Sequence, residues 1–382
     1  MSKSRNESEP STLDAMLSNG AEIVLERAAG ELRSGRPLAI EDGERRVLVA
    51  ALDGVSPSVF DAFVGMKKGS LILSAHRART LGLAAEHAVA VPLKGLDRRE
   101  AQRLAAAPRH DAPASWSRAD AAAEAASDLC KHALLLPAAL AAPLAADAPV
   151  PASLLRVALK DLLAATSPKV HNLEVVSAAD VPLAGGYTAK FMVFRGGPTP
   201  RDQVAVVVGD PDPSKPVLVR AHSACLTGDL FGSLKCDCGD QLRGAMDRLA
   251  EEGGGVLLYL DQEGRGIGIG NKMRAYALQQ EGFDTIEADA VLGFSSDERR
   301  FEYAASILLK LGYSKIVLLT NNPEKIGALT RAGLEVVARR PLFGAVTPQN
   351  RGYLQVKASR ANHALEPLIG PPTPSSKAAG ST

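Results

Sequence analysis

The chain has 382 residues, which is too long for one typical hydrophobic core, so we expect two domains. Apolar residues make up 46% and charged residues 23%, as in ordinary soluble globular proteins. With 44 basic and 43 acidic side chains the formal net charge is +1, which argues against a broad basic surface for nucleic acid. Any anion site must therefore depend on a few placed side chains.

The ends of the chain carry little that would fold. The opening MSKSRNESEPSTLD is polar and lacks the apolar stretch of a signal peptide. Residues 1–18 and 367–382 are expected to be disordered. No run of 18 or more uncharged apolar residues indicates a membrane span, so we expect a cytoplasmic protein without a membrane partner.

The first half alternates helical and extended patterns, which is typical of an α/β domain. The patterns predict helices at 21–32, 58–66 and 76–83. They predict strands at 38–40, 45–52 and 70–75. Residues 100–165 are rich in Ala and Pro, and we interpret them as a connector of short helices that completes a first unit of residues 19–165.

The second unit, residues 172–366, begins with extended segments and then alternates strands with helices. Strands are expected at 187–196, 203–209, 216–226, 255–260, 315–320 and 335–338. Helices are expected at 240–252, 271–280, 297–311 and 323–331. The predicted fold class is therefore α/β of mixed α+β character, with antiparallel strands and β-α-β units in the C-terminal domain.

Three of the four cysteines fall within fourteen residues, at Cys225, Cys236 and Cys238. In a reducing compartment such a cluster indicates a metal rather than disulfides. Three thiolates would leave a fourth zinc position for water, which the metal would activate near neutral pH. Two alternatives stay open: reduced buried cysteines, or a closed structural site with His222 as the fourth ligand.

A Gly-rich loop, DQEGRGIGIGNK, follows the strand at 255–260. Its glycines let backbone amides approach an anion, and Arg265, Lys272 and Arg274 favour a phosphate. The spacing fits neither a dinucleotide fingerprint nor a Walker A loop, so a flexible turn is the alternative. A carboxylate here, such as Glu263, can accept hydrogen bonds from two neighbouring N–H groups of one ligand, although the sequence does not fix which acid does so.

Two predicted helix starts carry charged residues. Ser295 and Glu298 fit a capping box with Asp297 in the first turn, but Arg299 suits a helix N-terminus only if an anion is near. Further on, Asn322 and Pro323 are typical of a helix start.

These segments together resemble GTP cyclohydrolase II. The matching stretches are CLTGD, CDCG, QEGRGIG and NKMRAYALQ, within residues 174–366. The resemblance implies one Zn²⁺ per chain on Cys225, Cys236 and Cys238. The family commonly has Glu before the first cysteine, where this chain has Ala224, and relatives often carry Arg at the position of Asp261.

The resemblance also implies further site residues. Asp297 would be a proton acceptor, Arg299 a nucleophile on the α-phosphate and Tyr276 an active-site tyrosine. A guanidinium has no free lone pair, so stabilisation of phosphate charge is the milder role for Arg299. The implied GTP contacts are Arg220, Ala221, His222, Ser223, Ala224, Gln241, Glu263, Gly264, Arg265, Thr285, Thr320 and Lys325.

The activity that the resemblance implies is hydrolysis of GTP to 2,5-diamino-6-(5-phosphoribosylamino)pyrimidin-4(3H)-one, formate and pyrophosphate, the first step of riboflavin biosynthesis. The resemblance also implies that Mg²⁺ binds with the triphosphate and that the enzyme is a homodimer. The alternatives are a paralogous zinc-dependent nucleotide hydrolase and a GTP-binding regulator. Residues near RAAGELRSGRPLAIEDGERR faintly resemble 3,4-dihydroxy-2-butanone 4-phosphate synthase, but most carboxylates of its Mg-binding loop are missing, so we expect a degenerate domain.

Overall fold

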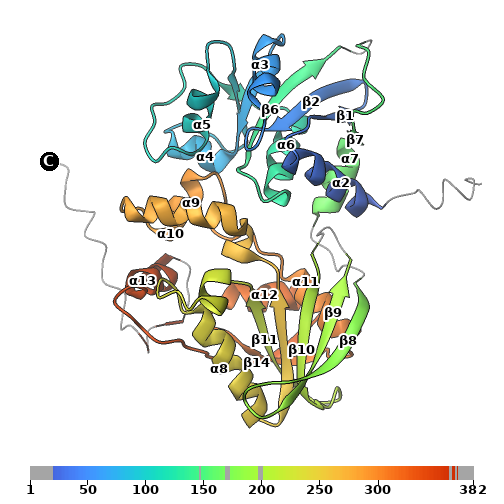
Figure 1. Ribbon diagram of the computed structural model, residues 1–382, viewed down its shortest axis with the longest axis vertical. Helices are drawn as coiled ribbons and strands as arrows, with labels where there is room; N and C mark the ends of the chain where they lie inside the picture. Colours follow the sequence, from blue (N-terminus) through green and yellow to red (C-terminus); the bar gives the residue numbers. More distant parts are fainter. Residues whose placement is uncertain are drawn as a thin grey trace, which may run out of the picture.

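The computed structural model describes residues 20–145, 148–167, 173–196, 201–360, 364–365 and 368. It contains two seven-stranded sheets, one in each half of the chain. The two sheets lie at opposite ends of the molecule in Figure 1. The expected disorder of 1–18 and 367–382 concerns residues outside this description, apart from residue 368. Within the described residues no helix combines the length and apolar character needed to cross a membrane.

The N-terminal sheet is antiparallel except for its β1–β7 pair, with the strand order β5-β4-β3-β6-β2-β1-β7. Its strands are β1 (Leu38–Asp42), β2 (Arg45–Ala51), β3 (Ser70–Leu73), β4 (Val89–Pro92), β5 (Ser117–Arg118), β6 (Ala138–Leu144) and β7 (Arg156–Ala158). Its helices are α2 (Ala21–Arg33), α3 (Pro57–Gly65), α4 (Ala75–Thr80), α5 (Arg98–Ala106), α6 (Ala121–His132) and α7 (Leu159–Thr166). The helices and strands predicted before residue 84 are confirmed.

The interpretation of 100–165 as a connector is wrong. Strand β6 lies between β3 and β2 in the middle of the N-terminal sheet, and α6 packs on it. Ala139 and Leu140 of β6 are fully buried. Alanine has little preference for strands, so the sequence pattern did not indicate this strand, which tertiary packing stabilises.

The C-terminal sheet has the order β14-β13-β11-β12-β10-β9-β8 and is mixed, which confirms the predicted fold class. Strands β14, β13, β11 and β12 pair in parallel, whereas β12, β10, β9 and β8 pair antiparallel. The strands are β8 (Glu174–Pro182), β9 (Thr188–Arg195), β10 (Gln203–Gly209), β11 (Val217–Ser223), β12 (Gly254–Leu260), β13 (Lys315–Leu319) and β14 (Glu335–Arg340). The chain leaves β11, β12 and β13 at one edge, where parallel sheets usually bind ligands.

Helices cover both faces of this sheet. On one face α8 (Cys238–Glu251) packs Ala245 and Leu249 against strand side chains that include Leu218 and Leu257. On the other face α11 (Glu302–Lys310) and α12 (Pro323–Arg331) contribute buried residues such as Ile307. Asn322 accepts a hydrogen bond from Glu324 N at 2.9 Å, which confirms the predicted start of α12.

The helix expected at 297–311 begins later, at Glu302. Ser295 does not act as its cap: the Ser295 hydroxyl donates to Asp297 O at 3.1 Å. The Glu298 carboxylate accepts from Ser295 N at 2.8 Å, but Glu298 N donates to Arg265 O at 3.0 Å. The amide of Glu298, which would donate to Ser295 in a capping box, is therefore bonded to the Gly-rich loop instead, and residues 295–300 form no regular helix.

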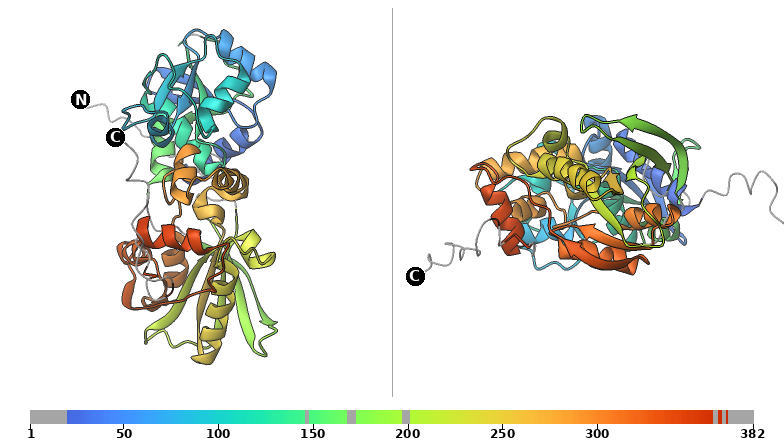
Figure 2. Two further views of the ribbon diagram at one scale, coloured as in Figure 1. Left: turned by 90° about the vertical axis from the view of Figure 1, so that its left-hand side faces the viewer. Right: turned by 90° about the horizontal axis from the view of Figure 1, so that it is seen from below.

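Two helices were missed by the sequence patterns, α10 (Thr285–Val291) and α13 (Arg351–Arg360). Helices α9 (Gly268–Gln280) and α10 form a hairpin between the two sheets, as Figures 1 and 2 show. Their apolar residues belong to the same hydrophobic core as Phe60, Phe63 and Leu71 of the N-terminal half. The packing boundary between the halves therefore does not follow the expected boundary at residues 165–172.

Candidate metal centre and nucleotide pocket

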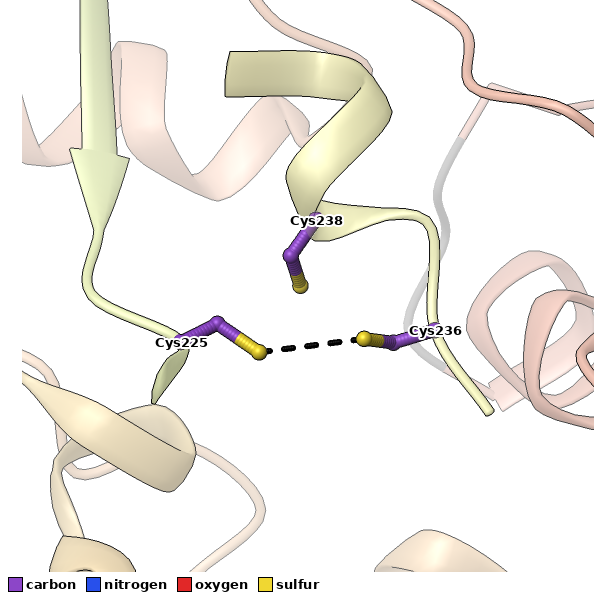
Figure 3. Close-up of side chains that lie close together, drawn as sticks. All are labelled: Cys225, Cys236 and Cys238. Atoms are coloured by element: carbon purple, nitrogen blue, oxygen red, sulfur yellow. Dashed lines mark hydrogen bonds between the residues drawn. The ribbon is translucent and has the colours of Figure 1, made fainter. Parts of the chain in front are cut away.

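The three cysteines of the predicted metal site meet at the edge of the C-terminal sheet. Cys225 follows β11, while Cys236 and Cys238 lie just before and at the start of α8. Figure 3 shows their sulfur atoms pointing toward one another. The Sγ atoms of Cys225 and Cys236 are 3.7 Å apart, and all three lie within 4.8 Å of one another. Sulfur atoms around a tetrahedral zinc, each about 2.3 Å from the metal, would be about 3.8 Å apart.

Two glycines let the chain wrap closely around the sulfur atoms. A Cβ added to Gly228 would lie 2.8 Å from Cys236 Sγ and 3.0 Å from Cys225 Sγ. A Cβ added to Gly239 would lie 2.3 Å from Gly228 O. The donor set and this close cradle both fit a zinc ion.

His222 does not join the sulfur cluster. Its Nε2 lies 3.1 Å from both carboxylate oxygens of Asp229, which also accepts from Cys225 N at 2.9 Å and from the Tyr259 hydroxyl at 3.0 Å. Within the described part of the chain the three cysteines form the only group of His, Cys or acidic residues close enough to share a metal. The geometry therefore favours a three-cysteine donor set over the closed alternative with His222 as a fourth ligand, and Asp229 holds the backbone of Cys225 in place.

The surroundings favour a thiolate, the form that binds zinc, at Cys225. Hydrogen bonding with the Cys236 and Cys238 thiols, followed by the charge of Lys272, lowers the pKa of Cys225. Lys272 Nζ lies 3.1 Å from Cys225 Sγ. Hydrogen bonding with Cys225 and Cys236, followed by burial, raises the pKa of Cys238, whereas its place as the first residue of α8 favours a negative charge through the helix dipole.

Replacing Gly228 with alanine is expected to lower the zinc content of the purified protein at least about tenfold, because the added methyl group would overlap two ligand sulfurs. Elemental analysis of the folded protein measures the effect. Gly30→Ala is the matched control, since a Cβ at Gly30 in α2 would meet no atom within 4 Å. A Gly228→Ala variant that retains one zinc per chain would contradict the close cradle.

A cavity beside the sulfur cluster brings together most of the residues that the sequence analysis assigned to GTP. Ala221 is the exception, because it is buried in β11 and offers only its carbonyl oxygen to Lys325. Asp297 faces a neighbouring cleft and reaches the cavity through Arg299. The assigned residues that line the cavity are Arg220, His222, Ser223, Ala224, Gln241, Glu263, Gly264, Arg265, Tyr276, Thr285, Arg299, Thr320 and Lys325.

Buried cations gather on one side of this cavity. Arg220 and Lys325 are 6% and 5% exposed. Burial lowers the pKa of Arg220 to about 10, and burial followed by the charges of Arg220 and Arg299 lowers the pKa of Lys325 well below its ordinary value. Arg220 Nε has no hydrogen-bond partner in the described structure. Buried cations whose positive charge is so little compensated by acidic side chains indicate a site that binds an anion.

Asp297 and Arg299 form a bidentate ion pair at the edge of the cavity. Asp297 accepts from Arg299 Nε at 2.8 Å and from Arg299 Nη2. Burial alone would raise the pKa of Asp297, but the hydrogen bonds and charge of Arg299 lower it overall. The same pairing outweighs burial at Arg299 and raises the pKa of its guanidinium. Both groups are therefore charged near neutral pH.

Comparison with known proteins decides the family. Residues 174–341 match the family model described as GTP cyclohydrolase II. Over 351 residues the chain is 46% identical to a GTP cyclohydrolase-2 of Xylella fastidiosa, which covers 91% of this chain and 88% of the relative. The chain belongs to the GTP cyclohydrolase II family.

Two further matches differ in extent. A GTP cyclohydrolase-2 of Shigella boydii is 52% identical over 167 residues, which cover 44% of this chain and 85% of that relative. A solved structure of RibBX, a two-domain 3,4-dihydroxy-2-butanone 4-phosphate synthase from A. baumannii, aligns with 84% of this chain and 99% of that one. Its TM-score is 0.30 at 18% identity, which is too low to indicate a shared arrangement.

The two positions at which this chain departs from the family pattern have different surroundings. Ala224 lines the cavity and offers it no polar side-chain group. Asp261 does not line the cavity; it pairs with Arg201 at 2.8 Å and faces the neighbouring cleft. Asp261 is therefore not in a position to contact a nucleotide held in the cavity.

Several cavity residues were not singled out as site residues by the sequence analysis. Asp289 of α10 and Lys357 of α13 line the cavity from helices that the patterns missed. Lys357 Nζ lies 3.2 Å from Oδ1 of Asp237, the residue that separates two of the cysteines in the sequence. Lys272 was noted only as a possible phosphate ligand, but it contacts Cys225 and Glu263 instead.

Proposed function

We propose that this chain is a zinc-dependent GTP cyclohydrolase II that hydrolyses GTP to 2,5-diamino-6-(5-phosphoribosylamino)pyrimidin-4(3H)-one, formate and pyrophosphate, the first step of riboflavin biosynthesis. The observation that carries the proposal is the three-sulfur cluster opening onto a cavity with buried, undercompensated cations. A zinc ion on three thiolates supplies a Lewis acid and an activated water at neutral pH. Mg²⁺ with the triphosphate, a homodimer and a cytoplasmic location are parts of this proposal that rest on the sequence and the family.

The chain's own residues would bind and orient the triphosphate. Arg220, Lys325 and Arg299 would neutralise its charge, and their burial makes each contact stronger than in water. The ion pair with Asp297 fixes the plane of the Arg299 guanidinium and keeps it charged. We therefore assign Arg299 to charge stabilisation at the α-phosphate rather than to nucleophilic attack.

Three acids line the cavity, Asp237, Glu263 and Asp289, and their contacts differ. Asp237 accepts from Lys357 Nζ at 3.2 Å and from Gln241 Nε2. Both oxygens of Glu263 are engaged: Oε1 accepts from Lys272 Nζ at 2.7 Å and Gly264 N at 3.0 Å, and Oε2 accepts from Leu226 N at 2.6 Å. Asp289 is 3% exposed, and its carboxylate accepts no hydrogen bond from the described residues, with Arg265 Nη1 at 3.7 Å. We infer that Asp289, rather than Glu263, accepts guanine N1–H and the exocyclic amine.

This assignment predicts a pH dependence. Burial raises the pKa of Asp289 to about 7. Two donors need the ionised form, so kcat/KM for GTP should fall about tenfold per pH unit below pH 7 and level off above it. Asp289→Asn should lower kcat/KM on the order of 100-fold and remove this limb of the profile. Inosine triphosphate, which lacks the amine, is the matched substrate: wild-type enzyme should prefer GTP strongly, and the variant should not.

The direct test of the proposed function is incubation of purified protein with GTP and detection of formate and pyrophosphate. Both products in equal amounts support the proposal. Pyrophosphate without formate would favour the paralogous hydrolase, and tight GTP binding without either product would favour the regulator. The paired Asp297 and Arg299 beside an open sulfur cluster argue against these alternatives.

A further inference from the structure

The α9–α10 hairpin faces the catalytic cavity on one side and the N-terminal half on the other. Ala275 and Leu278 of α9, together with Val291 of α10, are buried in one core with residues of the N-terminal sheet and helices, including Phe60 and Phe63. Ala275 also lines the cavity. The hairpin is thus an interior element of the N-terminal half, although its sequence belongs to the catalytic half.

Polar contacts fix the position of α9 against the N-terminal half. Asp53, which follows β2, accepts from both terminal nitrogens of Arg274 at 2.8 Å. Arg274 Nη1 also donates to Asn271 Oδ1 at 2.7 Å. Asn271 is fully buried, and its Nδ2 donates to Leu134 O at 3.1 Å and to Ile267 O at 2.9 Å. A continuous set of contacts therefore runs from Asp53 to the residue beside Lys272.

The approach of the two halves at this point is close. A Cβ added to Gly268, the first residue of α9, would lie 3.1 Å from Leu134 Cβ. Gly268 has φ +83° and Leu134 has φ +58°, so both backbones adopt the left-handed region where they meet. Ser74 donates to Gly293 O at 2.6 Å just beyond α10. Both ends of the hairpin are therefore anchored to the N-terminal half.

The other face of α9 carries groups that contact the metal centre. Lys272 Nζ lies 3.1 Å from Cys225 Sγ, 3.1 Å from Thr227 Oγ1 and 2.7 Å from Glu263 Oε1. One turn on, the ring of Tyr276 lies under Lys235, whose Nζ is 4.7 Å from the ring centroid. A small shift of α9 would change the distance from this ammonium to a zinc-binding sulfur, and misplacement by about 1 Å can cost on the order of 100-fold in rate.

We propose that the N-terminal domain is a positioning element of the active site, in which Asp53 holds α9 through Arg274 and Asn271 so that Lys272 stays on Cys225 and Glu263. This inference rests on the proposed function of the C-terminal half. It gives the N-terminal domain a role that needs no catalytic activity of its own. Among the described residues that domain has no group of acidic or histidine side chains arranged to share a metal. Asp53 touches neither the cavity nor the sulfur atoms, so any effect on the site is indirect, and its two strongest contacts are with Arg274 of α9.

The test uses the full-length protein with Asp53→Ala, which removes the contacts to Arg274 and a weaker one, at 3.4 Å, from Leu136 N. We expect kcat for formate release to fall about tenfold, with KM for GTP within about twofold and one zinc retained per chain. The charge-exchanged pair Asp53→Arg with Arg274→Asp should recover kcat to within about threefold of wild type. Glu31→Gln is the matched control, because it breaks a similar two-point pair with Arg36, at 2.6 and 2.8 Å, inside the N-terminal domain.

A second readout keeps this inference separate from the proposed function. Hydrogen–deuterium exchange of the amides of α9 should accelerate in Asp53→Ala and not in Glu31→Gln, whether or not the protein turns over GTP. Formate release by wild type with kcat unchanged in Asp53→Ala would overturn the inference, and so would equal losses in Asp53→Ala and Glu31→Gln. A double variant, Asp53→Arg with Arg274→Asp, whose kcat is as low as that of Asp53→Ala would also contradict the inference. Absence of formate from wild type, with the exchange result as expected, would refute the proposed function alone.

Discussion

Replacing Cys236 with serine is expected to lower formate release on the order of 1,000-fold or more and to remove the bound zinc. A serine hydroxyl is a poor zinc ligand at neutral pH, whereas a thiolate binds zinc at about 2.3 Å. Cys236 lies 3.7 Å from Cys225 Sγ, so its loss leaves two thiols, too few to hold the ion. Elemental analysis and a formate assay on the same sample measure both effects.

The control for this variant is Cys130→Ala. Cys130 is fully buried in the N-terminal core and forms no part of the sulfur cluster. Its substitution should leave zinc content and formate release within about threefold of wild type, because it removes only one sulfur atom from an apolar environment. A Cys236→Ser enzyme that kept wild-type activity would show that the cysteines do not serve the reaction.

Replacing Arg299 with alanine is expected to lower kcat/KM for GTP about 1,000-fold. The change removes a charged group that faces the cavity and leaves Asp297 without its two-point partner. Arg299→Lys should recover only a small part of the loss, because an ammonium cannot reproduce the flat guanidinium that pairs with Asp297. Steady-state kinetics with formate detection provide the measurement.

Two further observations would locate the role of Arg299. Arg300→Lys is the neighbouring control: Arg300 Nη2 donates to Thr166 O at 3.0 Å, and its side chain does not line the cavity, so activity should stay within about threefold. Rapid acid quenching of wild type with GTP labelled at the α-phosphate should leave no label on the protein. A labelled Arg299 would contradict charge stabilisation and restore the nucleophile.

The sequence predicted that Cys225, Cys236 and Cys238 form one group, because the signals there are local. Cys225, Cys236 and Cys238 lie within one loop and a helix start, and Thr320 and Lys325 flank a helix start marked by Asn322. These residues follow parallel strands, so the topology brings them to one edge without any long-range information.

The parts that the sequence did not predict depend on contacts between distant segments. The alanines of β6 carry too weak a pattern to indicate a central strand, and its pairing with β2 and β3 and its packing with α6 define it. The irregular segment before α11 exists because Glu298 N is bonded to Arg265 O, 33 positions away in the chain. Asp289 lies on a short helix whose burial comes from the N-terminal half. None of these partners is adjacent in sequence.

Stoichiometry of metal and product in one preparation tests the central claim most directly. The purified full-length protein should contain one zinc ion per chain, and each GTP consumed should yield one formate. Removal of the metal by a chelator should abolish formate release, and added Zn²⁺ should restore it. Full formate release from protein that contains no bound metal would contradict the account.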